Sequence, residues 1–208
     1  MAMADTAQLE LLQSGVDRWN RWRFAHPTVR PNLRGADLHG IDLAGANLHD
    51  AYLLGANLSQ AYLFEADFQS ANLRGANLTR CCLIGANLHN AYLAEANLYH
   101  AYLAETDLSD AYLAQANLRE ADLTNALLTA AFLGGADLWK ADLSRVYEVE
   151  IATLRTAQNL EFAVLDAPIR ADLDLPEPPI DAGTPSPDLS DVSAQTNDRD
   201  STLIPDSH

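Results

Sequence analysis

Hydrophobic residues recur along this chain with a period of five. Leucine occupies every fifth position from Leu33 to Leu143, except where Phe68 takes its place, and alanine stands two positions before most of these leucines. On an α-helix five steps rotate a side chain by about 140°, and on a flat strand an odd period puts successive leucines on opposite faces. The pattern therefore predicts a chain that turns after every five residues and stacks these turns into a solenoid, with Leu and Ala inside.

The repeating units resemble those of the pentapeptide-repeat family, whose pattern is Ala-(Asp/Asn)-Leu-X-X. Ala46-Asn47-Leu48-His49-Asp50, for example, is followed by Ala51-Tyr52-Leu53-Leu54-Gly55, and 23 consecutive units fill residues 31–145. The resemblance implies an all-β fold, a right-handed, quadrilateral (four-sided) parallel β-helix with four units in each coil. The residue before Leu supports an even number of sides, because Tyr and Asn mostly alternate there. We expect the Asn and Asp side chains of this column to bond to the neighbouring backbone.

Segments of different character flank the repeats. In residues 1–30, Leu9, Leu12, Val16 and Trp19 are spaced as on one face of a helix that begins near Thr6 and ends before Pro27. We predict an N-terminal amphipathic capping helix, with Trp22 and Phe24 extending its apolar cover and the arginines solvated. Its capping residues are Leu12, Val16, Trp19 and Trp22.

The five-residue repeat ends at Val146. Residues 146–167 are predicted to form a C-terminal cap, with a short helix or loop near 148–157 and a closing turn. Residues 168–208 hold seven of the nine prolines, surrounded by Ser, Thr and Asp. This composition has too little apolar content to offset the entropy of ordering, so we expect an acidic, Pro-rich disordered tail.

Charge is distributed unevenly over the 13 basic and 29 acidic side chains. The net charge is +1 for residues 1–30 (four basic, three acidic), −7 for residues 31–145 (six against thirteen) and −10 for residues 146–208 (three against thirteen). The first 30 residues lack the apolar core of a signal peptide, and no apolar run approaches the length of a membrane span. We therefore expect a cytoplasmic protein without membrane contact.

The sequence carries no recognisable catalytic or metal-binding motif, such as a Gly-rich phosphate loop, HExxH or GxSxG. His49 and His89 share a predicted face but lie two coils, about 10 Å, apart, too far to bind one metal ion. Cys81 and Cys82 are interpreted as free thiols of a reducing compartment. We therefore predict no enzyme activity, no cofactor and no metal site.

Arginines and tryptophans alternate in residues 18–23, an arrangement that also suits phosphates and bases. Packing of the tryptophans on Leu33 and Leu38 explains the same residues more simply. We accordingly expect a cap here and no nucleic-acid binding.

If residues twenty apart stack, the repeats form four faces, named here by their first leucine. The Leu33 face has a net charge of +1, the Leu38 face 0, and the Leu43 and Leu48 faces −4 each. The Leu43 face also carries an apolar patch between two acidic residues, typical of a contact site. The residues of this candidate partner surface are Tyr62, Phe64, Glu65, Ile84, Tyr102 and Glu105.

Two functions are compatible with such a rod. The first is a rigid, non-enzymatic scaffold for protein–protein interaction, binding an unknown protein partner or a second copy of itself. The second, which the family resemblance adds, is mimicry of DNA to modulate DNA gyrase, as in fluoroquinolone resistance. Duplex DNA carries a charge every ~1.7 Å, or roughly 16 charges over the about 27 Å of this rod. The repeats carry −7, so we favour the scaffold.

The period makes a direct prediction about the interior. Replacing Leu83 with Asp places an unpaired charge among buried leucines and is expected to abolish folding. The β-rich circular dichroism spectrum of the wild type should disappear. A folded variant with unchanged spectrum would contradict the inward placement of these leucines.

Overall fold

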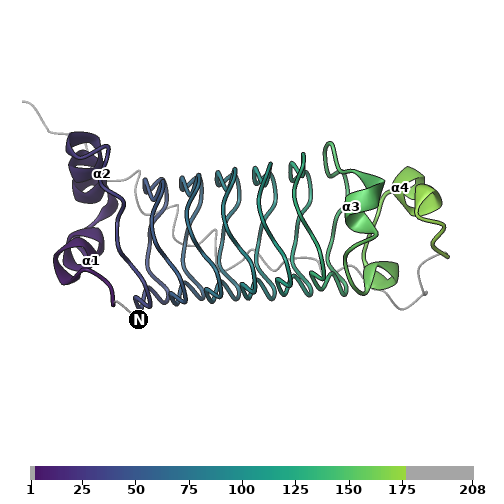
Figure 1. Cartoon of the computed structure of the whole chain (residues 1–208), viewed down its shortest axis with the longest axis horizontal. Helices are drawn as coiled ribbons and strands as arrows, with labels where there is room; N and C mark the ends of the chain where they lie inside the picture. The colour runs from purple at the N-terminus through teal and green to yellow at the C-terminus, as the bar shows by residue number, and fades with distance from the viewer. Residues whose placement is uncertain (1–2, 177–208) are drawn as a thin grey trace, which may run out of the picture.

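The computed structural model describes residues 3–176, which form a rod with helices at both ends (Figure 1). At one end lie α1 (Thr6–Gln13) and α2 (Val16–Ala25). At the other end lie α3 (Ile151–Leu154), the short 3-10 helix η1 (Leu160–Phe162) and α4 (Ala167–Asp172). Between them the regular structure consists of single-residue parallel β-bridges rather than longer strands.

Successive coils pair at a register of twenty residues. The residue before each central Leu bridges its counterpart twenty positions later, as in the pair Asn32 and Tyr52. Leu33 N donates to Tyr52 O at 2.8 Å, and Tyr52 N donates to Pro31 O at 2.8 Å. Twenty residues are four units, so each coil has the four sides that the family resemblance implied, in agreement with the even number of sides that the alternation of Tyr and Asn indicated.

The interior is filled by the two apolar positions of each unit. Every central Leu, and Phe68 in its place, is at most 1% exposed, and the alanines two positions earlier are buried with them. Thr106 takes one of these alanine positions, where its hydroxyl Oγ1 donates to Leu83 O at 2.9 Å. The buried hydroxyl of Thr106 is therefore satisfied by a backbone carbonyl, as buried polar groups usually are.

The corners are tight turns that require a left-handed residue. In the first of them Ala36 N donates to Leu33 O at 3.1 Å, with Gly35 at a φ of 62°. Because φ is positive at the third residue, this is the type II geometry. The last residue of each of the 23 units has a positive φ, and in 16 of them that residue is not glycine.

The Asn and Asp column bonds as expected. Asn77 Oδ1 accepts from Thr79 N at 3.2 Å. The same bond, from the backbone N–H two residues later to the Asn or Asp side-chain oxygen, recurs along the rod. Asn77 Nδ2 also donates to Asn57 Oδ1 in the preceding coil at 3.2 Å. These side chains therefore support the corner within a coil and the stacking between coils.

The N-terminal segment differs from the predicted single helix. The chain breaks between α1 and α2 at Ser14 and Gly15, where Gly15 has a φ of 116°, a conformation that L-residues rarely adopt. Leu12 and Trp19 are buried against the rod from the two helices. The predicted role of Phe24 in the apolar cover is wrong, because its side chain is 90% exposed.

The C-terminal segment is ordered beyond the expected boundary. The ladder continues to Tyr147 and then shifts register, with Asp137 bridged to Gln158 and Asp142 to Val164. A helix, α4, crosses the boundary that the sequence suggested between residues 167 and 168, because Arg170 and Leu173 are buried against the end of the rod. The remainder of the predicted tail, residues 177–208, lies outside the described residues.

The corner geometry predicts opposite effects for two Ala→Gly changes. Ala130 is an exposed corner residue with a φ of 53°, so Gly there should relieve the left-handed strain and stabilise the fold by about 0.5–1 kcal/mol. Ala104 occupies a turn position without positive φ, so Gly there should destabilise by a similar amount, about 0.5–1 kcal/mol. Urea unfolding measures both; a loss of stability in Ala130→Gly would contradict the corner assignment.

Candidate functional site

The predicted patch lies on the outside of the Leu43 face. Phe64 is 44% exposed and Ile84 is half-buried, and their turns are stacked because Glu65 N donates to Ile84 O at 3.1 Å. Tyr62 and Tyr102 are half-buried in the adjoining column. Cys82 lies between these two tyrosines in the same column and forms a β-bridge with each of them. Its side chain is only 5% exposed. The structure thus brings the predicted apolar residues together on one face.

Two acidic corners border this patch. Glu65 and Glu105 are exposed, with φ values of 52° and 60°. Gly85 occupies the corner between their coils, and Glu65 Cγ lies 3.5 Å from the point where a Gly85 Cβ would stand. The aliphatic part of Glu65 therefore extends over the glycine. The patch is apolar in its centre and anionic along its corner edge.

The two cysteines contribute packing rather than reactivity. Burial raises the pKa of Cys81 far above its usual range, and burial also raises the pKa of Cys82. Thiolates are the nucleophilic and metal-binding form. Both side chains therefore remain neutral thiols near pH 7, and neither supplies a nucleophile to the patch.

A second apolar surface lies on the Leu33 face, which the sequence reasoning did not single out. Tyr92, Tyr112 and Phe132 follow one another at the twenty-residue spacing and are 51%, 43% and 45% exposed. The rings of Tyr112 and Phe132 stack with centroids 5.0 Å apart and planes 5° apart. We call these three side chains the aromatic row.

The neighbouring turn residues explain this exposure. Beside the aromatic row stand Ala94, Ala114 and Gly134, which add little bulk around the rings, whereas Phe64 and Ile84 flank the Leu43-face tyrosines. The Phe132 ring lies over Gly134, where an added Cβ would stand 2.6 Å from its Cε1 and Cζ atoms. The result is a groove of about 500 Å³ lined by Asn72, Arg74, Tyr92, Ala94, Glu95, Tyr112, Ala114 and Gln115. Stacking at twenty residues, applied to the turn positions as well as to the tyrosines, could have revealed it.

Cations lie beside this groove. Arg74 Nη2 contacts Glu95 Oε1 at 2.7 Å on the groove wall, and the guanidinium of Arg34 lies 4.1 Å from the ring centroid of Tyr52. The Leu33 face is thus the face with excess positive charge. The other three faces are neutral or acidic.

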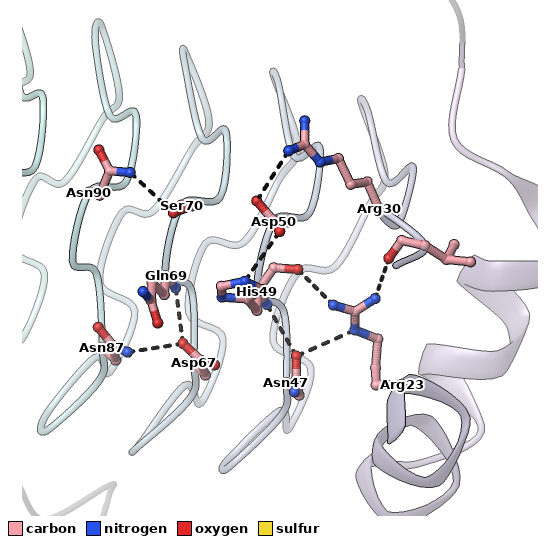
Figure 2. A network of polar contacts seen from close by, with 11 residues as sticks. Arg23, Arg30, Asn47, His49, Asp50, Asp67, Gln69, Ser70, Asn87 and Asn90 are labelled. Carbon is pink, nitrogen blue, oxygen red and sulfur yellow. Dashed lines mark hydrogen bonds and ion pairs between the residues drawn. The ribbon is translucent and has the colours of Figure 1, made fainter. Parts of the chain in front are cut away.

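Arg23 anchors α2 to the first coil of the rod (Figure 2). Its guanidinium donates to Asn47 Oδ1 at 3.3 Å, to His49 O at 2.8 Å and to Val29 O. Burial lowers its pKa from the ordinary value, while the carboxylates of Asp50 and Asp67 act in the opposite direction. The expectation that all arginines here are solvated is therefore wrong for Arg23, which is 4% exposed.

The predicted capping residues differ in burial. Trp19 is fully buried and its Nε1 donates to Asn47 O at 2.7 Å, and Leu12 is also buried. Val16 and Trp22 are partly buried against the same core. Of the alternating Arg and Trp residues, Trp19 and Arg23 are thus turned into the protein, which leaves fewer side chains for a phosphate or a base.

Histidines pair with single carboxylates on the surface. His49 Nε2 lies 3.2 Å from Asp50 Oδ2, and His100 Nε2 lies 3.0 Å from Glu120 Oε2. The other carboxylate oxygen of Asp50, Oδ1, lies 3.9 Å from Arg30 Nη2. Within residues 3–176 no group of three His, Cys, Asp or Glu side chains is placed to hold a metal ion. Over the same residues, none of the helices has the length and apolar content to cross a membrane.

Comparison with solved structures shows several similar rods. Rfr23, a pentapeptide-repeat protein from the cyanobacterium Cyanothece 51142, is 26% identical over 71% of this chain and 97% of its own, with a TM-score of 0.51. HetL from Nostoc sp. strain PCC 7120, involved in regulating heterocyst differentiation, is 31% identical over 65% of this chain and 68% of its own, with a TM-score of 0.41. QnrB1, a plasmid-mediated fluoroquinolone resistance protein, is 20% identical over 70% and 84%, with a TM-score of 0.41.

A search of curated proteins finds no match to the chain. The family model for pentapeptide repeats matches residues 32–69, 41–80, 71–110 and 106–145, together more than half of the chain. These matches support the right-handed quadrilateral β-helix that the family resemblance implied. The chain belongs to the pentapeptide-repeat family.

Proposed function

We propose that this protein is a rigid, non-enzymatic scaffold that binds a protein partner through the Leu43 face. The observation that carries the proposal is the exposed Phe64 beside Ile84 on one face of the rod. Large apolar side chains at turn positions are not needed for the fold, because the corresponding turns hold Ala44, Ala104, Thr124 and Ser144. Contact with a partner would explain why Phe64 and Ile84 stand at these turn positions.

The backbone beneath the patch is already ordered. The turn of Phe64 is bonded on both sides, since Gly45 N donates to Phe64 O at 2.8 Å and Glu65 N donates to Ile84 O at 3.1 Å. Little backbone freedom is left to lose on binding. Preorganised surfaces of this kind retain more of the free energy of burial as affinity.

The charge of the patch defines the chemistry of the partner. Glu65 and Glu105 border the apolar centre, and the whole Leu43 face has a net charge of −4. We therefore expect a partner that inserts an apolar side chain between basic residues. Complementary charge of this kind accelerates association and selects against acidic competitors.

Mimicry of DNA receives less support from the same charges. The acidic side chains gather on two faces, and several of them on the remaining faces pair locally, as Asp137 does with Arg119 at 3.2 Å. A continuous helical array of unpaired charge is what a DNA mimic requires. Inhibition of gyrase supercoiling at micromolar protein would reverse this ranking.

The double variant Phe64→Ser, Ile84→Ser tests the scaffold. Burial of these two side chains at an interface contributes about 2–4 kcal/mol, so the variant should bind a partner, or a second copy, about 30- to 700-fold more weakly. Sedimentation measures self-association, and titration of a partner isolated with the wild-type protein measures hetero-association. The thermal midpoint should not change, because neither residue fills the core.

The matched control removes the same kind of surface from another face. Tyr112→Ser, Phe132→Ser alters two exposed rings of the Leu33 face and should leave the affinity at its wild-type value. Equal losses in the two double variants, or wild-type affinity in the Phe64 and Ile84 variant, would contradict the proposal.

The proposal also assigns α1 and α2 to closing the N-terminal end. An open coil exposes unpaired backbone groups and leucine side chains that another chain could join. Asn20 covers part of this edge, because Asn47 N donates to Asn20 Oδ1 at 2.8 Å and Asn20 Nδ2 donates to Gly45 O at 2.9 Å. Arg23 and Trp19 add the bonds to Asn47 and His49 described above.

Replacing Arg23 with Met tests this cap. The variant leaves several carbonyl oxygens without their buried donor and should lower the free energy of unfolding by about 2–4 kcal/mol. Arg21→Met, an exposed change on the same helix, should stay within about 0.5 kcal/mol of the wild type. Urea unfolding measures both variants, and equal stabilities would argue against the cap.

A further inference from the structure

We propose that the segment 177–208 of this chain binds in the groove of the Leu33 face, along the aromatic row. The segment and the groove have complementary chemistry. The groove is lined by the exposed rings of Tyr92 and Tyr112 together with Ala94 and Ala114, and the segment holds five prolines among 32 residues. Grooves lined by aromatic rings are the usual receptors of Pro-rich chains in the polyproline II conformation, which lose little entropy on binding.

Charge favours this face over the others. Residues 177–208 carry seven acidic side chains against Arg199, a net charge of −6. The Leu43 and Leu48 faces, at −4 each, repel such a segment, whereas the Leu33 face carries Arg34 and Arg74 against Glu95. The ring of Trp139 on the neutral Leu38 face is already covered by Arg119 at 4.4 Å and Lys140 at 4.6 Å.

The segment can reach the groove. Arg170 donates to Pro176 O at 2.7 Å and to Ala163 O at 2.7 Å, which places Pro176 at the C-terminal end of the rod. The groove begins near Gln115, and Gly135 of the next coil donates through its N–H to Thr156 O in the C-terminal segment. A polyproline II segment of 32 residues spans about 100 Å, far more than the few coils to be covered.

The spacing of the rings also fits. Three residues of a polyproline II helix advance about 9.3 Å, and two coils of the rod advance about 9.6 Å. A segment that runs along the rod therefore presents every third residue to every second ring, such as Tyr92 in the groove and Phe132 two coils further along the aromatic row. Binding of the segment would cover the exposed rings of Tyr92 and Tyr112 and would compete with any other ligand of this face.

Cysteine accessibility tests the proposal without an external partner, so its result is independent of the proposed function. Ala114→Cys places a thiol in the groove, and Ala104→Cys places one at the equivalent, similarly exposed turn position of the Leu43 face. Cys81 and Cys82 are buried, so their reaction with a disulfide reagent such as DTNB should be slow. The labelling rate is compared between the full chain and a chain that ends after Pro176.

We expect the groove thiol to react at least fivefold more slowly in the full chain than in the shortened chain, and the Ala104→Cys thiol to react equally in both. A full-length variant with Pro178, Pro179, Pro185 and Pro187 replaced by Ser should lose most of the protection. A synthetic peptide of residues 177–208 should restore it to the shortened chain, and less so after Arg74→Glu. Unchanged slow reaction of Cys81 and Cys82 reports that every variant is folded.

Three results would overturn the proposal. Equal rates for the groove thiol in the full and shortened chains would mean that the segment does not cover the groove. Equal protection of the two introduced thiols would mean that the segment does not select the Leu33 face. Protection of the full chain that disappears on dilution would assign the groove to a second copy of the protein.

Discussion

A left-handed residue at each corner is the constraint on which the rest of this rod depends. A chain of L-residues can reverse direction after every five positions only if one residue of each unit adopts positive φ, and all 23 units meet this condition. The turn directs Leu inward and aims the N–H groups at the neighbouring coil. In 16 units the residue is not glycine, at a strain of roughly 1–2 kcal/mol each. Burial of the leucines and the bonds between coils must offset that strain.

This arrangement separates folding from recognition. Two of the five positions fill the core, one sets the corner, and the position before the central Leu supports the turn where it is Asn or Asp. The remaining turn position varies from unit to unit. The Leu33 and Leu43 faces illustrate the consequence, because both carry tyrosines before the central Leu. Small neighbours expose Tyr92 and Tyr112 on the first face, whereas Phe64 and Ile84 form the surface of the second. One unit therefore yields two surfaces of different shape.

Charge distinguishes the same two faces. Acidic corners border the Leu43 patch, whereas cations accompany the rings of the Leu33 face. The rigid rod keeps the acidic residues of one face apart from the cations of the other, since residues on different sides of a coil cannot rearrange toward one another. The two faces are thus suited to ligands of opposite charge, a basic partner on the Leu43 face and an acidic segment on the Leu33 face.

The sequence by itself determined the repeat: the inward Leu and Ala, an even number of sides and the backbone bonding of the Asn and Asp column follow from the five-residue period, the alternation of Tyr and Asn, and local turn chemistry. With the four units per coil that the family resemblance implied, the sequence also located the apolar residues of the Leu43 face, because residues twenty apart then stack. The tertiary structure alone decided features that depend on distant contacts. Arg23 is buried because its acceptors include Asn47 and His49, more than twenty residues away.

Contacts between residues far apart in the sequence also account for the helical segments at the two ends of the rod and for the exposure of the aromatic row. The helix breaks at Gly15 so that Leu12 and Trp19 can both meet the rod, and α4 is ordered because Arg170 reaches Ala163 O. Exposure of Tyr92, Tyr112 and Phe132 depends on which side chains flank each ring after the coils have stacked. A period specifies what repeats, but the burial of a single side chain is set by neighbours that only the folded chain brings together.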